Sequence, residues 1–184
     1  MRIVAGKYRS RRLEAPKGMS TRPTQDKVRE AVFSSLGGFF DGGRMLDLYA
    51  GSGAVALEAL SRGMEEAVLC DPDKNAVQIQ RHNIDSLKET NARILPVRAR
   101  QAIRVLAGEG KPFDLVYLDP PYRRQENKEI IELLLENNLL CKDATVVIES
   151  LKEDEFPKVI GTLECVRTAE YGITKISYFK NREE

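Results

Sequence analysis

The hydrophobic residues that follow position 44 occur in short runs, and segments with helical periodicity separate these runs. The runs predict five β-strands, at residues 45–49, 67–70, 93–97, 115–118 and 145–149. The segments between and after them predict helices at residues 54–62, 73–88, 101–106 and 128–135. Strands that alternate with helices are typical of βαβ units. The pattern therefore predicts an α/β fold with a mainly parallel sheet.

The two ends of the chain depart from this alternation. Residues 163–168 and 173–179 are separated by a short turn that contains Gly172, which predicts an antiparallel hairpin. Upstream, Pro23 begins a predicted helix that ends at Gly37. Its apolar positions repeat every four residues, at Val28, Val32 and Leu36. We therefore expect a mixed sheet with one further helix before it.

Composition places the chain among globular proteins, because 42% of the 184 residues are hydrophobic and 31% are charged. This length fits one domain, and we expect residues 1–184 to form it. No run is long enough to span a membrane, and residues 1–17 lack the apolar core of a signal peptide. A cytoplasmic location without a membrane partner is therefore expected.

The cysteines and the histidine give little support for metal or disulfide chemistry. Cys70, Cys141 and Cys165 are widely spaced and form no CxxC pair, which argues against a zinc site and a disulfide framework. His82 is the single histidine and lies in a predicted helix, without a pattern of catalytic partners. We expect no metal, and cysteines that serve as small buried hydrophobic residues.

The net charge of +1 conceals an uneven distribution. Residues 1–30 carry nine basic and three acidic residues, a net of +6, whereas the remainder has a net charge of −5. The basic residues are Arg2, Lys7, Arg9, Arg11, Arg12, Lys17, Arg22, Lys27 and Arg29. A cationic segment suits a polyanion, because each neutralised phosphate releases counterions. Nucleic acid fits best as the partner, and a solvated terminus with incidental charge is the alternative.

The first predicted strand leads through a glycine turn into a helix, with the sequence Asp47-Leu48-Tyr49-Ala50-Gly51-Ser52-Gly53-Ala54. Glycines allow close backbone approach to a ligand, and the helix N-terminus offers unpaired N–H donors. Asp71 follows the second strand, 20 residues after Gly51, where its carboxylate can accept both hydroxyl hydrogens of a ribose. This spacing predicts an adenosine-containing cofactor. A tight turn without a ligand is the alternative.

The segment Asp119-Pro120-Pro121-Tyr122 follows the fourth strand, at the edge where open α/β sheets bind ligands. The prolines lack N–H donors, so carbonyl oxygens and the Asp119 carboxylate face the crevice as acceptors. These acceptors suit the two hydrogens of an exocyclic amine and can direct its lone pair at an electrophile. The Tyr122 ring can stack on a base, which is worth about 1–3 kcal/mol. A rigid turn with a capping aspartate is the alternative.

The two motifs together suit methyl transfer from a sulfonium, and this predicts S-adenosylmethionine as the cofactor. The carrier holds an activated methyl group, so the protein needs neither a metal nor a strong base. Its main task is to align the amine with the bond between sulfur and the methyl carbon.

Over its whole length the chain closely resembles the RsmD-type family of bacterial methyltransferases, which act on guanine N2 of 16S ribosomal RNA. The resemblance lies in Met1-Arg2-Ile3-Val4-Ala5-Gly6, Arg22-Pro23-Thr24, Val28-Arg29-Glu30 with Phe33, Asp47 to Gly53, Leu57-Glu58-Ala59-Leu60-Ser61-Arg62, Asp119 to Tyr122 and Glu149-Ser150. The opening and the Arg-Pro-Thr segment are the specific parts, because Asp-Pro-Pro-Tyr also occurs in adenine-N6 methyltransferases of DNA.

The resemblance implies a Rossmann-like class I fold of the S-adenosylmethionine-dependent type. It implies a mostly parallel seven-stranded sheet with a C-terminal antiparallel hairpin and a basic N-terminal extension. Residues 1–24 would form an RNA-contacting arm and residues 25–184 the catalytic core. The partner would be 16S ribosomal RNA or a small-subunit assembly particle, and we expect the protein to act as a monomer.

The resemblance also assigns site residues. The cofactor would be bound by Asp47, Ala50, Gly51, Ser52, Gly53, Asp71, Pro72, Arg98 and Ala99. The target amine would be held by Asp119, Pro120, Pro121 and Tyr122. RNA would be contacted by Arg2, Lys7, Arg9, Arg11, Arg12, Arg22, Arg123 and Arg124. At position 98 the family more often has Asp or Asn, and arginine cannot accept a hydrogen bond from an adenine amine. Adenine recognition is therefore expected to rest on backbone groups.

Three other functions remain open. An adenine-N6 methyltransferase of DNA or RNA shares the acceptor motif, although 184 residues leave no room for a sequence-reading domain. A noncatalytic RNA-binding or assembly factor would be expected to lose Asp119 or the glycine loop, and both are intact. A nicotinamide oxidoreductase would require a proton donor beside a hydride site, and none is identifiable.

Overall fold

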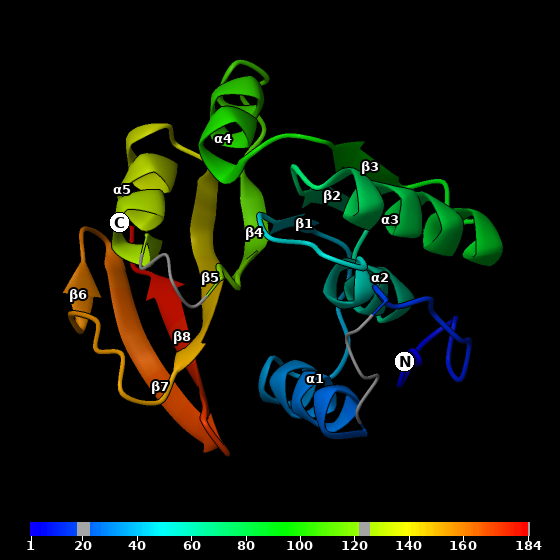
Figure 1. Cartoon of the computed structure of the whole chain (residues 1–184). Helices are drawn as coiled ribbons and strands as arrows, with labels where there is room; N and C mark the ends of the chain where they lie inside the picture. The colour runs from blue at the N-terminus through cyan, green and yellow to red at the C-terminus, as the bar shows by residue number, and fades with distance from the viewer. Residues whose placement is uncertain (18–22, 122–125, 184) are drawn as a thin grey trace.

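A central sheet with helices on both faces forms the framework of the protein in the computed structural model, which describes residues 1–17, 23–121 and 126–183 (Figure 1). Its strands are β1 Arg44–Asp47, β2 Glu66–Cys70, β3 Ala92–Leu95, β4 Phe113–Leu118, β5 Leu140–Leu151, β6 Val159–Ile160, β7 Leu163–Tyr171 and β8 Thr174–Asn181. Their order in the sheet is β3-β2-β1-β4-β5-β8-β7-β6. The sheet thus contains the predicted strands and, in addition, the two-residue strand β6.

The first five strands are parallel. The chain adds β2 and β3 on one side of β1, then crosses back and adds β4 and β5 on the other side, so the switch point of the sheet lies between the neighbouring strands β1 and β4. Asp47 of β1 is paired with Leu69 of β2 on one side and with Tyr117 of β4 on the other. The carboxyl ends of these three strands therefore meet at one edge. In open α/β sheets, ligands bind in the crevice at such a switch point.

The last part of the sheet is antiparallel, because β8 returns beside β5 and β7 pairs with β8. The predicted hairpin is confirmed, with a turn at Gly172 between β7 and β8. Strand β5 is longer than the predicted 145–149. Its first residues include exposed Lys142 and Asp143, and Asp143 has a positive φ of 63°, so this half lacks a continuous hydrophobic pattern.

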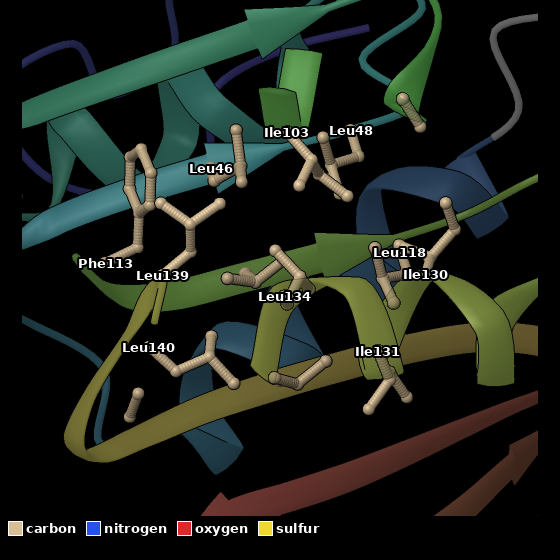
Figure 2. Close-up of a cluster of buried hydrophobic side chains, with 14 of the residues drawn as sticks. Leu46, Leu48, Ile103, Phe113, Leu118, Ile130, Ile131, Leu134, Leu139 and Leu140 are labelled. Carbon is tan, nitrogen blue, oxygen red and sulfur yellow. The ribbon is translucent and has the colours of Figure 1, made fainter. Parts of the chain in front are cut away.

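Five helices cover the two faces of the sheet in the part of the chain that the structure describes. They are α1 Pro23–Ser35, α2 Ala54–Ser61, α3 Lys74–Leu87, α4 Ala99–Ala107 and α5 Asn127–Glu136. Adjacent strand residues face opposite sides, so Leu46 belongs to a core with α4 and α5, whereas Met45 belongs to a core with α1, α2 and α3. Figure 2 shows the first core, in which Ile103 of α4 and Ile131 and Leu134 of α5 lie over the sheet.

The N-terminal segment, residues 1–17, packs against the helices of the second core. Ile3 and Leu13 are buried in that core, and an antiparallel bridge joins Arg2 to Arg12. The side chain of Asn83 in α3 accepts a hydrogen bond from the backbone N–H of Glu14 at 2.8 Å. The basic residues of this segment therefore project from a folded and anchored backbone.

Glu58 in α2 is the main polar anchor of this segment and is completely buried. Its carboxylate accepts hydrogen bonds from the backbone N–H groups of Val4 at 2.9 Å and Ala5 at 3.1 Å. It also pairs with Arg29 of α1 at 3.2 Å and with Arg62 at 2.8 Å. A buried carboxylate is tolerated when its charge and lone pairs are satisfied in this way.

Two further expectations concern membranes and cysteines. Among the described residues, no helix is both long and apolar enough to cross a membrane. Cys70 is buried in the sheet, as predicted, whereas Cys141 and Cys165 are half-buried, and all three thiols are free.

Candidate active site

A cavity of about 1030 Å³ opens at the carboxyl edge of the parallel strands. It is lined by Gln25, Leu48, Tyr49, Gly51, Asp71, Pro72, Arg98, Ala99, Arg100, Asp119, Pro120, Pro121, Glu126 and Glu149. The cavity thus brings together the end of β2, the glycine loop after β1, the start of α4 and the end of β4. The two sequence motifs single out three of these segments, and the start of α4 is the one that only the family resemblance assigns.

The glycine loop between β1 and α2 has a backbone conformation that favours glycine at two positions. Gly51 and Gly53 have positive φ angles of 52° and 85°. A Cβ atom on Gly53 would lie 2.8 Å from the side chain of Leu69 in β2, so a larger residue would push the loop away from the sheet. Ala50 is buried beneath the loop, and Ser52 is half-buried.

Asp71 follows β2 and joins the glycine loop to the turn before α3. One carboxylate oxygen, Oδ2, accepts the backbone N–H of Gly51 at 3.0 Å. The other, Oδ1, accepts the backbone N–H of Asp73 at 2.9 Å. Each carboxylate oxygen can accept a further hydrogen bond, so Asp71 retains capacity toward the cavity that it lines. Pro72, beside it, is exposed.

Two polar residues of α3, neither of which was assigned a role from the sequence, hold the glycine loop through hydrogen bonds. Gln80 donates from Nε2 to the carbonyl of Gly51 at 2.8 Å. Asn83 donates from Nδ2 to the carbonyl of Ser52 at 3.0 Å. Both are buried on the apolar face that includes Val77 and Ile84. A polar side chain at a core-facing helical position was the available signal.

Arg98 and Ala99 stand at the start of α4. Arg98 is the N-cap residue, but its side chain makes no capping hydrogen bond and is exposed. Ala99 is buried against the sheet. The first backbone N–H groups of a helix have no partner within it, so this helix end offers donors to the cavity that both residues line.

Asp119 and the two prolines after β4 form one wall of the cavity. Asp119 is half-buried, Pro120 is buried and Pro121 is exposed. Burial raises the pKa of Asp119 well above its usual range, and the nearby charges of Glu149 and Asp47 raise that pKa further. These effects favour the protonated form of Asp119, and a hydrogen-bond donor or a positive charge bound in the cavity would favour the ionised form.

Asp47, at the end of β1, lies below the cavity and does not line it. The side chain is 1% exposed, and Oδ1 accepts the backbone N–H of Tyr49 at 3.2 Å. Burial is the largest cause that raises the pKa of Asp47 to about 7, and the charges of Asp71 and Glu149 add to this shift. Its closest described partner is thus the backbone that leads into the glycine loop.

Several cavity residues were not assigned a role from the sequence. The Tyr49 hydroxyl donates to Oε1 of Glu126, the residue before α5, at 2.6 Å. The Tyr117 hydroxyl donates to Oε2 of Glu149 at 2.7 Å. Glu149 follows Ile148, which is paired with Leu118 in β4. Its position at the end of the predicted fifth strand, residues 145–149, was the available signal.

The predicted RNA-contacting residues of the N-terminal segment are exposed, and none lines the cavity. They are Arg2, Lys7, Arg9, Arg11 and Arg12. Lys7 pairs with Glu89 at 3.3 Å, and Arg11 donates to the carbonyl of Ser86 at 2.7 Å. Four other predicted site residues, Arg22, Tyr122, Arg123 and Arg124, lie outside the described residues.

Two observations concern possible metal ligands and the single histidine. Over residues 1–17, 23–121 and 126–183, no three His, Cys, Asp or Glu side chains are grouped so that they could hold a metal ion. His82 is exposed on α3, where its Nε2 lies 3.6 Å from Glu14. It lies on the surface of the predicted helix and does not line the cavity.

Comparison with known proteins identifies relatives of the whole chain. The Bacillus subtilis protein YlbH is 40% identical over 183 residues, which cover 99% of this chain and 100% of that protein. Ribosomal RNA small subunit methyltransferase D of Escherichia coli strain K12 is 39% identical over 159 residues, or 86% of this chain and 79% of that enzyme. The solved structure of Escherichia coli yhhF is 36% identical, with a TM-score of 0.86 and coverage of 100% of this chain and 99% of that one.

These similarities confirm the predicted fold class, a class I methyltransferase fold with a mostly parallel sheet and an antiparallel end. The model of the family described as "Conserved hypothetical protein 95" matches residues 1–180. The chain therefore belongs to this family, the RsmD-type family that its motifs resemble.

Proposed function

We propose that this protein transfers the methyl group of S-adenosylmethionine to the exocyclic N2 amine of a guanine in small-subunit ribosomal RNA. The observation that carries the proposal is a shared cavity: Asp71 and Gly51 line one part of it, and Asp119 lines another. A cofactor and a target base bound in it would be neighbours. The 39% identical Escherichia coli enzyme is named for methylation of small-subunit ribosomal RNA, which supports the substrate class.

The residues of the cavity fit the cofactor. The spare lone pairs of Asp71 can accept the ribose hydroxyls, while Gly51 permits close approach of the ligand to the backbone. The exposed N–H groups at the start of α4 can donate to an adenine ring nitrogen, a role that Arg98 cannot fill by accepting from the adenine amine. S-adenosylmethionine supplies a methyl group that is activated by attachment to a positively charged sulfur.

Asp119 would hold and orient the target amine. Its carboxylate and the carbonyl oxygens of the proline turn can accept the amine hydrogens, which directs the nitrogen lone pair toward the methyl carbon. A bond forms between nitrogen and carbon as the bond between carbon and sulfur breaks, and its electron pair remains on sulfur. The nitrogen then loses one proton, which Asp119 can accept because its pKa is raised in this environment. Pro120, Pro121 and Tyr122 would complete this subsite.

RNA would reach the cavity across the basic N-terminal segment. The exposed side chains of Arg2, Lys7, Arg9, Arg11 and Arg12 would contact phosphates, together with Arg22, Arg123 and Arg124. A guanine flipped out of its stack could then enter the cavity. The proposal includes residues 1–24 as the RNA-contacting part of one domain, a monomeric enzyme, and a cytoplasmic substrate that is free 16S ribosomal RNA or an assembling small subunit.

The test is transfer of radiolabelled methyl from S-adenosylmethionine to small ribosomal subunits from cells that lack this protein, followed by nucleoside analysis. Label in N2-methylguanosine is the expected result. Label in N6-methyladenosine would instead identify an adenine-N6 enzyme. Cofactor and RNA binding without any transfer would identify a noncatalytic binding factor.

The variant Asp119→Asn tests the role of Asp119, because it keeps the shape of the side chain and removes its charge. Transfer should fall by about 100-fold or more, as observed when an electrostatic contact of a transition state is removed. The dissociation constant for S-adenosylmethionine should change little, because Asp119 is assigned to the amine. Asp41→Asn, at an exposed position outside the cavity, is the control and should retain full activity.

A further inference from the structure

Glu149 stands beside Asp119 at the edge of the sheet. Leu118, the last residue of β4, is paired with Ile148 of β5 in a parallel register, so Asp119, just after β4, lies beside Glu149, near the end of β5. Adjacent strands lie about 4.8 Å apart, and residues at equivalent positions face the same side. Both side chains line the cavity. A base whose amine is held by Asp119 would therefore lie within reach of Glu149.

The two oxygens of Glu149 have different surroundings. Oε2 accepts the hydroxyl of Tyr117 at 2.7 Å, and Tyr117 is 4% exposed within the sheet. This buried hydroxyl fixes the carboxylate at the cavity wall. In the described part of the chain, Oε1 receives no hydrogen bond. An ionised carboxylate accepts through both oxygens, so Glu149 has acceptor capacity that the fold does not use.

An ionised Glu149 carboxylate at this position is destabilised unless the cavity holds a hydrogen-bond donor. Burial raises the pKa of Glu149, and the hydrogen bond from Tyr117 lowers it. Its charge in turn raises the pKa values of Asp119 and Asp47. A glutamine could fill the same space beside Tyr117 without this repulsion. The presence of a carboxylate favours a ligand that donates at least two hydrogen bonds to this edge of the cavity.

The Watson–Crick edges of guanine and adenine differ in this respect. Guanine presents two adjacent donors, the N1–H and the N2 amine. Adenine presents the N6 amine beside N1, which is an acceptor and carries no hydrogen. Two neighbouring carboxylates complement the guanine edge, whereas the second carboxylate would face the N1 lone pair of adenine and repel it.

We infer that Glu149 determines base specificity by accepting the N1–H of the target guanine through Oε1, while Asp119 accepts the adjacent N2 amine. This inference rests on the proposed function, because it assumes that guanine N2 is the methylated atom. It assigns to Tyr117 a positioning role through Glu149. It also accounts for the use of an Asp-Pro-Pro-Tyr motif on guanine, since the motif alone would serve adenine equally well.

The test replaces the target guanosine in the RNA by 2,6-diaminopurine riboside, which keeps the N2 amine but has an unprotonated N1. The RNA is assembled into the small-subunit particle, and kcat/KM for methyl transfer is measured for both bases. For the wild-type protein, the loss of one charge-assisted hydrogen bond should lower kcat/KM by roughly 10- to 100-fold. An equal kcat/KM for the two bases would overturn the inference.

The variant Glu149→Gln tests the same contact by changing the protein in place of the base. An amide can donate to the unprotonated N1, so the preference for guanine should disappear or reverse, while the dissociation constant for S-adenosylmethionine stays unchanged. An unchanged preference would show that Glu149 does no more than support Tyr117. Glu153→Gln, the same change at an exposed position just beyond β5, is the matched control and should keep the wild-type preference.

The two proposals can fail separately. If the wild-type protein forms no N2-methylguanosine in any particle, the proposed function fails, and the role of Glu149 fails with it. If N2-methylguanosine forms but the preference for N1–H does not depend on Glu149, the role of Glu149 alone is refuted. The comparison of guanine with 2,6-diaminopurine on the wild-type protein requires no variant, so a folding defect of Glu149→Gln cannot obscure the result.

Discussion

Gln80 in α3 donates a hydrogen bond from Nε2 to the carbonyl oxygen of Gly51 at 2.8 Å, and its side chain is completely buried. The same Gly51 donates its N–H to Asp71. Side chains from outside the loop thus bind both the backbone N–H and the carbonyl of Gly51. Side chains of the protein itself therefore hold the glycine loop in place.

Gln80→Met should therefore loosen the loop while keeping the size of the buried side chain. The carbonyl of Gly51 would lose its donor, which costs about 1–3 kcal/mol when the group stays buried. We expect urea unfolding to show a loss of this order and calorimetry to show weaker S-adenosylmethionine binding. Gln78→Met, at an exposed position of the same helix, is the control. Wild-type stability and affinity in Gln80→Met would show that the hydrogen bond contributes nothing.

Asp47→Asn should make folding stability less dependent on pH. The folded-state pKa of Asp47 is raised from 3.8 to about 7, so between these values the folded protein holds a proton that the unfolded chain has lost. The contribution of Asp47 to stability therefore falls as pH rises through this window. Integrated over the shift, the penalty above pH 7 is on the order of 4 kcal/mol.

The measurement is urea unfolding of wild type and Asp47→Asn at pH 5 and pH 8. The variant should gain stability relative to wild type at pH 8, and this gain should be smaller at pH 5. The raised pKa values of Asp119 and Glu149 act in the same direction and remain in the variant, so some dependence on pH will persist. Asp85→Asn, at an exposed position of α3, should keep the wild-type profile. Parallel profiles for wild type and Asp47→Asn would refute the role of Asp47.

The alternation of hydrophobic and helical segments was sufficient to predict β1 to β5 and the helices between them. Buried strands and amphipathic helices have distinct periods, and these periods are visible in the sequence. Strand β6 could not be predicted, because Val159 and Ile160 are too few to show a period. The early part of β5 was missed because Asp143, with its positive φ, interrupts the hydrophobic run.

The predicted site was most complete where short motifs end strands. Asp71, Arg98 and Asp119 belong to separate segments, and the structure brings them to one cavity as expected from parallel strands. Asp47 proved to be buried below the cavity, which a motif cannot reveal. Glu149 and Gln80 were not assigned, because a polar residue in an apolar element signals that it has a role, but its partners are known only once its three-dimensional neighbours are known.

Asp71→Asn should weaken S-adenosylmethionine binding by roughly 10-fold or more, since hydrogen bonds to charged groups contribute about 1.5–3 kcal/mol each. Because Asp71 also holds the N–H of Gly51, the loss alone does not show contact with the ribose. Binding should therefore be measured for S-adenosylmethionine and for its 2′,3′-dideoxy analogue. Wild type should discriminate strongly between them and Asp71→Asn weakly. Equal discrimination by both proteins would remove Asp71 from the ribose site.

Replacement of Arg9, Arg11 and Arg12 by glutamine should flatten the salt dependence of RNA binding. Each neutralised phosphate contributes about 0.7 to the slope of log K against log salt on a single strand and about 0.9 on a duplex. If each of the three side chains neutralises one phosphate, the slope of the variant should be smaller in magnitude by about 2 to 3. Arg11 also donates to the carbonyl of Ser86, so unfolding of the variant by urea should be measured alongside.

The matched control replaces three other exposed residues by glutamine, namely Lys142, Lys158 and Arg182. They belong to the β5 to β8 side of the sheet, away from the N-terminal segment (Figure 1). This control removes the same charge but should leave the slope unchanged. If both triple variants lower the slope equally, binding responds to net charge and the N-terminal segment has no special role. A change confined to the Arg9, Arg11 and Arg12 variant would place the phosphate contacts on the anchored segment, whose backbone Glu58 and Asn83 fix against the helices beside the glycine loop.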